Sequence, residues 1–180
     1  MIIVHAVQKL LNISRLKPLL FLSKPSPQQE LHSWYAKLIS TSFRGKLFVM
    51  YVHEPSLILV LTKGKTISNT LPEFYNRLEA LLKRNHFKTD FIEREIKLIR
   101  EGYVISKTNN KSILANMNSI TLNIEWTCTR FESYDSIDAD SIEDSYLEWI
   151  SYDSSKPNKF KQTVDYWKNK GLINEYETEK

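Results

Sequence analysis

Cysteine and glycine are scarce in this chain, with one and four copies among 180 residues. A single cysteine excludes an intramolecular disulfide and a cysteine-based zinc cluster. Its place on an apolar helical stripe predicts that Cys128 is a buried thiol. None of the glycines belongs to a GxGxxG or GxxxxGK[ST] pattern, which argues against the nucleotide-binding loops of those types.

Long hydrophobic runs and metal-ligand spacings are also missing. No apolar stretch approaches the ~18 residues of a membrane-spanning helix. The first residues, Met1 to His5, lack the basic segment and cleavage-like site of a secretion signal. The four histidines are not spaced as metal ligands, and no HExxH motif occurs. We therefore expect a soluble cytoplasmic protein with no metal, no cofactor and no membrane association.

Motifs for nucleophilic or nuclease chemistry are weak. The GxSxG pattern is absent. Asp90 and the run from Glu93 to Lys97 superficially resemble the carboxylate-x-Lys arrangement of metal-dependent nucleases. The run has helical periodicity, however, in which Glu93 and Lys97 form an ordinary i,i+4 pair. A helix surface explains this segment better than a nuclease site does.

Charge is distributed unevenly along the chain. Residues 1–134 hold 19 Lys and Arg against 10 Asp and Glu, whereas residues 135–180 hold 6 against 11, so a +9 body precedes a −5 tail. Such a body favours a polyanionic, phosphorylated or acidic partner, although a lysine-rich surface that only maintains solubility has the same charge. We predict a basic body over 1–134 and an acidic helical extension, packed on it, over 135–180.

Hydrophobic periodicity predicts an α+β fold with a small, at least partly antiparallel sheet of about four strands packed with several helices. The predicted strands are 2–6, 46–52, 56–62 and 103–106. The main predicted helices are 8–13, 27–40, 71–85, 90–101 and 110–131. The prediction of a helix over 27–40 depends on Ser26 as its N-cap and Pro27 as its first helical residue.

The extension is predicted to contain two short amphipathic helices, one over 142–150 and one over 157–171. They carry Trp149 and Trp167, whose large apolar area is rarely left in water. Two interpretations stay open. The helices complete the core of the body, or the acidic segment covers the basic face and competes with a polyanion.

A dense run of hydrogen-bonding side chains follows the last predicted strand. Its candidate ligand-binding residues are Lys107, Thr108, Asn109, Asn110, Lys111, Ser112 and Asn116. An apolar stripe begins here and continues through Ile113, Met117, Ile120, Ile124 and Cys128. A helix start offers unpaired backbone N–H groups and the positive end of the helix dipole, and Lys107 and Lys111 flank it. The sequence therefore predicts an anion-binding turn.

A second basic cluster follows from the predicted hairpin. Antiparallel pairing brings the open ends of strands 46–52 and 56–62 together, so the cations there should be neighbours. They are Arg44, Lys46, Lys63 and Lys65. Basic residues at hairpin ends also serve only to maintain solubility and block edge pairing, and this alternative stays open.

His5 at the end of the first strand is the candidate catalytic histidine, with Lys9. A histidine there is either a satisfied buried residue or a general acid–base near neutral pH. The second role needs a cation such as Lys9 or Lys107 to lower its pKa.

Two stretches of the sequence resemble a family of small uncharacterised bacterial proteins, a domain of unknown function. Residues 1–10, MIIVHAVQKL, are similar to its MIIxHATQKL run, and residues 107–118, KTNNKSILANMN, to its KTxNRSxLGxMN run. This chain departs from the pattern at Val7, Lys111 and Ala115, where the family has Thr, Arg and Gly. The resemblance spans about residues 1–130 and implies no activity, but it implies that His5, Gln8, Lys9 and the turn share one site.

Three functions are consistent with these observations. The leading hypothesis is a binding module for nucleic acid or another phosphate-bearing ligand at 107–118. The second is a metal-independent phosphodiester or phosphoryl-transfer enzyme that uses His5 with nearby lysines. The third is a protein–protein interaction module that meets an acidic partner.

Overall fold

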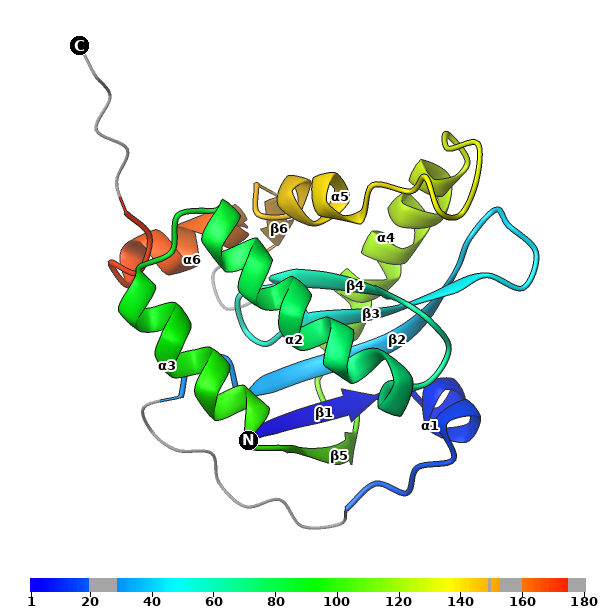
Figure 1. Cartoon of the computed structure of the whole chain (residues 1–180), viewed down its shortest axis with the longest axis horizontal. Helices are drawn as coiled ribbons and strands as arrows, with labels where there is room; N and C mark the ends of the chain where they lie inside the picture. The colour runs from blue at the N-terminus through cyan, green and yellow to red at the C-terminus, as the bar shows by residue number, and fades with distance from the viewer. Residues whose placement is uncertain (20–28, 149, 153–159, 175–180) are drawn as a thin grey trace.

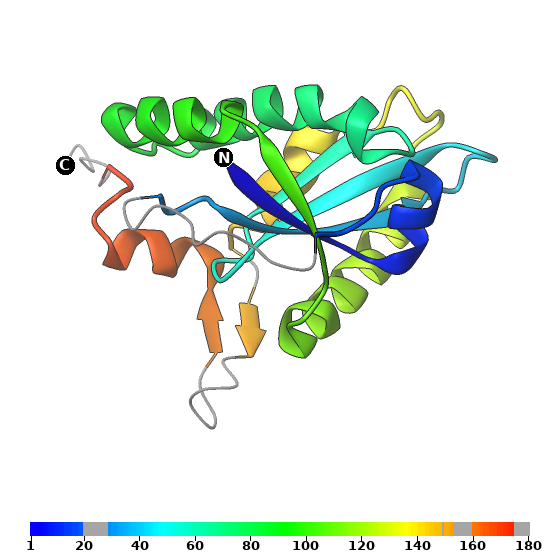
Figure 2. The same ribbon diagram turned by 90° about the horizontal axis from the view of Figure 1, so that it is seen from below.

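The computed structural model describes residues 1–19, 29–148, 150–152 and 160–174. It has an α+β fold in which helices cover both faces of a five-stranded sheet (Figures 1 and 2). The sheet contains β1 (Ile2–Ala6), β2 (Ser33–Ser40), β3 (Leu47–His53), β4 (Leu59–Lys63) and β5 (Tyr103–Lys107). The helices are α1 (Gln8–Ser14), α2 (Ile67–Arg84), α3 (Thr89–Arg100), α4 (Lys111–Cys128), α5 (Ala139–Ser145) and α6 (Thr163–Asn169).

The strand order of the sheet is β4-β3-β2-β1-β5. β1 pairs in parallel with β2 and with β5, whereas β2, β3 and β4 are successively antiparallel. A separate antiparallel ribbon joins β6 (Ile150–Tyr152) to β7 (Phe160–Gln162). The α+β class, the partly antiparallel sheet and the hairpin of β3 and β4 are thereby confirmed, with five strands in the main sheet rather than about four.

The helix predicted at 27–40 is wrong for the described residues, because 33–40 form the strand β2. The apolar residues of β2 alternate between two cores: Trp34 and Ala36 face one core, and Tyr35 and Ile39 face the other. A strand buried on both faces has an almost continuous apolar sequence, which also satisfies a helical pattern. The expected cap at Ser26 and Pro27 lies outside the described residues.

Two hydrophobic cores lie on opposite faces of the sheet. Figure 2 shows α2 and α3 on one side and α4 on the other. The core under α4 contains five residues of that helix, Ile113, Met117, Ile120, Ile124 and Cys128, all at most 6% exposed. The predicted apolar stripe of this helix is therefore confirmed. No helix among the described segments is long and apolar enough to span a membrane.

Helix α2 begins at Ile67, one turn earlier than the predicted start at residue 71. Thr66 is the N-cap, and its hydroxyl oxygen accepts a hydrogen bond from the Asn69 amide at 3.4 Å. Thr70 is buried instead, and its hydroxyl donates to the Thr66 carbonyl oxygen at 2.9 Å. Pro72 is accommodated inside the helix, close to its start.

Helix α5 covers the edge of the sheet at β4. The Leu61 N–H donates to Oε1 of Glu143 at 2.8 Å. This carboxylate is fully buried, and Arg77 and Arg84 bind it from α2, with shortest Nη2–Oε2 distances of 2.9 and 3.3 Å. An open strand edge is a template for aggregation, and here a paired carboxylate occupies one of its N–H groups.

The described part of the extension contributes to both cores. Its buried apolar residues in the core beneath α4 are Ile137, Ala139, Ile142 and Tyr146, and those in the core on the α2–α3 side are Leu147 and Trp167. Trp167 of α6 is fully buried against Phe87, Phe91 and His53. Two backbone hydrogen bonds tie the same segment to the body, from the Lys88 N–H to the Leu172 carbonyl at 3.0 Å and from the Asn174 N–H to the His86 carbonyl at 2.9 Å. These contacts favour core completion over a detachable competitor for residues 163–174.

The two helices expected in the extension are shorter than predicted. Residues 150–152 and 160–162 are the strands of the ribbon, because they pair with each other rather than continue the helical periodicity. Trp149 and Pro157 lie outside the described residues.

Replacing Trp167 should strongly destabilise the protein. Trp167→Ala should lower the free energy of unfolding by about 3–5 kcal/mol, because it removes a large ring from a packed core. Trp126→Ala is the matched control, since Trp126 is 59% exposed, and should change stability by less than about 0.5 kcal/mol. Chemical denaturation followed by circular dichroism measures both. A Trp167→Ala protein as stable as the wild type would favour the competing-tail interpretation.

His53 should make stability depend on pH. It is fully buried, its ring nitrogens are bonded to the Glu30 carbonyl oxygen at 2.9 Å and the Ser56 hydroxyl at 2.7 Å, and burial lowers its pKa from 6.5 to about 3. The unfolded chain binds the proton first as pH falls, so this group should remove up to about 1.4 kcal/mol of stability per pH unit below about 6. The difference in unfolding free energy between wild type and His53→Gln isolates this slope. Parallel pH profiles would contradict the assignment.

Candidate functional site

The predicted turn follows β5 and lies beside the end of β1 and the first half of β2. The parallel register places His5 opposite Tyr35 on one side and Ser106 on the other. The His5 ring stacks on the Tyr35 ring with a centroid distance of 4.8 Å. His5 is only 5% exposed, and its Nδ1 lies 3.1 Å from the Lys107 carbonyl oxygen. Since a carbonyl only accepts, Nδ1 carries the proton, and the ring holds the first residue of the turn.

Tyr35 holds the middle of the turn. Its hydroxyl donates to Oδ1 of Asn109 and accepts from the Asn110 N–H at 3.2 Å. Burial, and then the nearby Glu54 carboxylate, raise the pKa of Tyr35 to about 12. The phenol therefore stays protonated at neutral pH and remains a donor.

Glu54 supports the same turn from the other side. Its Oε1 accepts from Nδ2 of Asn110 at 2.6 Å, and its Oε2 accepts from the Ser33 hydroxyl at 3.2 Å. A negative charge therefore lies next to the predicted anion site. This residue belongs to the hairpin connection and was not predicted as part of the site.

Asn110 is the N-cap of α4. Its Oδ1 accepts from the backbone N–H groups of Ser112 at 2.9 Å and Ile113 at 3.2 Å, as a capping side chain should. Two of the N–H groups expected to be free for an anion are thus occupied within the protein. Asn116 also turns back, and its Nδ2 donates to the Ser112 carbonyl oxygen at 3.1 Å.

Lys107 and Lys111 are exposed on either side of this turn. Neither forms an ion pair with any residue that the structure describes. Lys9 is exposed near the start of α1, and Thr108 is half-buried. Over the described parts of the chain, no hydrogen bond or ion pair joins Lys9 to His5. The structure thus brings His5 to the turn through Lys107, whereas Lys9 is not tied to it.

The second predicted cluster gathers at the open end of the hairpin. Lys46, Lys63 and Lys65 line a hollow of about 220 Å³ together with Tyr134. The ammonium groups of Lys46 and Lys63 lie 5.4 and 5.1 Å from the Tyr134 ring centroid. Arg44 is exposed in the preceding turn and does not line this hollow. Sequence reasoning missed Tyr134, which comes from the loop after α4.

Helix α4 connects the two clusters. Its first residue is Lys111, and at its other end the Cys128 carbonyl accepts from the Ser42 hydroxyl of the β2–β3 turn at 3.1 Å. Tyr134 packs against the core beneath α4. Between the ends, the Lys37 ammonium of β2 donates to Oδ1 of Asn118 at 2.8 Å, and burial lowers the pKa of Lys37. Lys37 therefore lies on the α4 side of the sheet, between the two ends of the helix.

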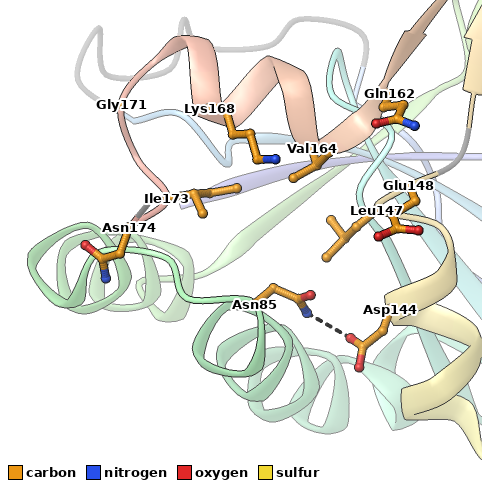
Figure 3. A pocket seen from close by; sticks show the side chains of 10 residues that line it. All are labelled: Asn85, Asp144, Leu147, Glu148, Gln162, Val164, Lys168, Gly171, Ile173 and Asn174. Atoms are coloured by element: carbon orange, nitrogen blue, oxygen red, sulfur yellow. Dashed lines mark hydrogen bonds between the residues drawn. The ribbon is translucent and has the colours of Figure 1, made fainter. Parts of the chain in front are cut away.

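A separate hollow of about 480 Å³ lies between α2, α5 and α6 (Figure 3). Asn85 donates to Asp144 at 2.8 Å on its wall. Its other lining residues are Leu147, Glu148, Gln162, Val164, Lys168, Gly171, Ile173 and Asn174. None of these residues was predicted as a site residue. Within the described ranges, no group of three or more His, Cys, Asp and Glu side chains could hold a metal ion.

Comparison with curated proteins gives no match. A family model described as a domain of unknown function, DUF6933, matches residues 3–170. The match includes the turn and its supporting strands, and it extends through α6, beyond the residues that the sequence resemblance covered. The chain therefore belongs to this family, DUF6933, whose function is unknown.

Proposed function

We propose that the protein is a binding module for nucleic acid or another phosphate-bearing ligand, with its contact surface at the turn and helix start of 107–118. The observation that carries this proposal is the pair of exposed lysines, Lys107 and Lys111, on a turn held in place by His5, Tyr35 and Glu54. A fixed turn presents its cations at little entropic cost, which favours binding.

The lysine side chains supply the contact, rather than the helix N–H groups. Asn110 already occupies two of those groups, and the Glu54 carboxylate behind the turn repels a deeply placed phosphate. A phosphate would therefore lie on the outer side, against the two ammonium groups. Contacts of this kind release counterions, so affinity falls steeply as salt rises.

Removing the two lysines should weaken binding and reduce its salt dependence. Lys107→Ala/Lys111→Ala should lower the slope of log K against log salt for an oligonucleotide by about 1–2. Lys88→Ala/Lys97→Ala is the matched control, because it removes the same charge from exposed positions at α3, across the sheet from α4. Fluorescence anisotropy from ~50 mM salt upward measures the slopes.

Two outcomes would contradict the proposal. If the folded protein binds neither heparin nor RNA at ~50 mM salt, the polyanion hypothesis is removed. If Lys88→Ala/Lys97→Ala weakens binding as much as Lys107→Ala/Lys111→Ala does, the body binds through its overall positive charge rather than through the turn. Capture of an acidic protein without binding to phosphate polymers would favour an interaction module.

The placement of His5 favours binding over catalysis. A general acid–base must reach the proton that it transfers, whereas His5 is 5% exposed and bonded to the Lys107 carbonyl. His5→Ala should therefore lower the melting temperature, and His5→Phe, which keeps a ring against Tyr35, should lower it less. A His5→Ala protein that melts like the wild type but has lost a phosphodiester-cleaving activity of the wild type would instead support the enzyme hypothesis.

A further inference from the structure

We infer that the ligand is a single-stranded nucleic acid that lies along the outer face of α4 and stacks a base on Trp126. This inference rests on the proposed function and specifies its ligand class. It is argued from an exposed aromatic ring, its arginine neighbour and the cations at both ends of the helix.

Trp126 is the only exposed tryptophan in the parts of the chain that the structure describes. It is 59% exposed, whereas Trp34 and Trp167 are fully buried. Leu122, one turn earlier on the same helix face, is 70% exposed. The opposite face of α4 already packs on the sheet, so these two side chains contribute nothing to the core.

Arg130 lies over the Trp126 ring. Its guanidinium carbon is 3.8 Å from the ring centroid, the distance of a stacked cation–π pair. The guanidinium covers one side of the indole, and a base can stack on the other side. Such stacking is sequence-tolerant, because every base has a π face, and the arginine N–H groups can donate to an adjacent phosphate.

Charge complementarity favours a strand that follows the helix. Lys107 and Lys111 lie at its start, and Lys46, Lys63 and Lys65 line the hollow near its end. An α-helix of 18 residues is about 27 Å long, a span of several nucleotides. A flexible polyanion can therefore meet both clusters while one of its bases reaches the indole.

The ring distinguishes a single strand from other polyanions. In a duplex the bases are stacked on one another inside the helix, so none is free to cover Trp126. An acidic peptide or heparin can neutralise the lysines but has no base to stack. Sequence-independent single-strand binding combines a basic track with exposed aromatic side chains, and the outer side of α4 offers both.

The test uses the full chain and three probes: oligo(dT) of about 12 nucleotides, a DNA duplex of the same length, and heparin. Oligo(dT) should bind more tightly than the duplex and should change the tryptophan fluorescence, whereas heparin should bind without that change. Trp126→Ala should weaken oligo(dT) binding about 5- to 150-fold, the value of one stacked base. Its heparin affinity should be unchanged.

Two further variants separate stacking from general effects. Trp126→Phe keeps a smaller aromatic surface and should retain part of the affinity. Leu122→Ala is the matched control, since it removes an exposed apolar side chain from the same face, and should bind oligo(dT) like the wild type.

The outcomes distinguish this inference from the function on which it rests. If Trp126→Ala binds oligo(dT) like the wild type while the Lys107/Lys111 variant is weakened, stacking is refuted and the binding function stands. If the duplex binds as tightly as the single strand, the ligand class is wrong. If no probe binds, both proposals fail. If Trp126→Ala or Leu122→Ala instead changes the sedimentation of the free protein, the face is a self-association surface.

Discussion

The parallel pairing of β1 with β2 and β5 is the constraint on which the arrangement of the site depends. These strands come from residues 2–6, 33–40 and 103–107, and their register sets His5 between Tyr35 and Ser106. Parallel neighbours end at the same edge of a sheet, so the turn after β5 lies where β1 gives way to α1. The stacking of His5 on Tyr35 and the bond from His5 to the Lys107 carbonyl both follow from that register.

Polar side chains then satisfy backbone N–H groups that the sheet edge and the start of α4 leave unpaired. Asn110 occupies the start of α4, and Glu143 occupies an N–H group at the edge of β4. The Leu61 N–H is buried, and an unpaired buried donor costs about 1–3 kcal/mol, so Glu143 has a structural role. Asn110 and Asn116, which the sequence suggested as ligand-binding residues, stabilise the turn, whereas Lys107 and Lys111 are exposed.

Helix α4 has two different faces. One face carries the apolar stripe that closes the second core, and the other presents Leu122 and Trp126 to solvent between two groups of cations. Leu122 and Trp126 do not belong to either hydrophobic core. The extension contributes to both sides of the sheet: Trp167 joins the core on the α2–α3 side, and Ile142 and Tyr146 join the core beneath α4.

Sequence alone determined the elements whose patterns are local. The strand at 2–6, the hairpin, and the helices near 90–101 and 110–131 follow from periodicity and caps, because each pattern lies within one segment. Tertiary structure decided the rest. Residues 33–40 satisfy both a helical and a buried-strand pattern, and only pairing with β1 and β3 makes them a strand. The sequence could not assign Tyr35 and Glu54 to the site either. Their partners are more than 50 residues away, and such proximity depends on strand order, which no local sequence pattern encodes.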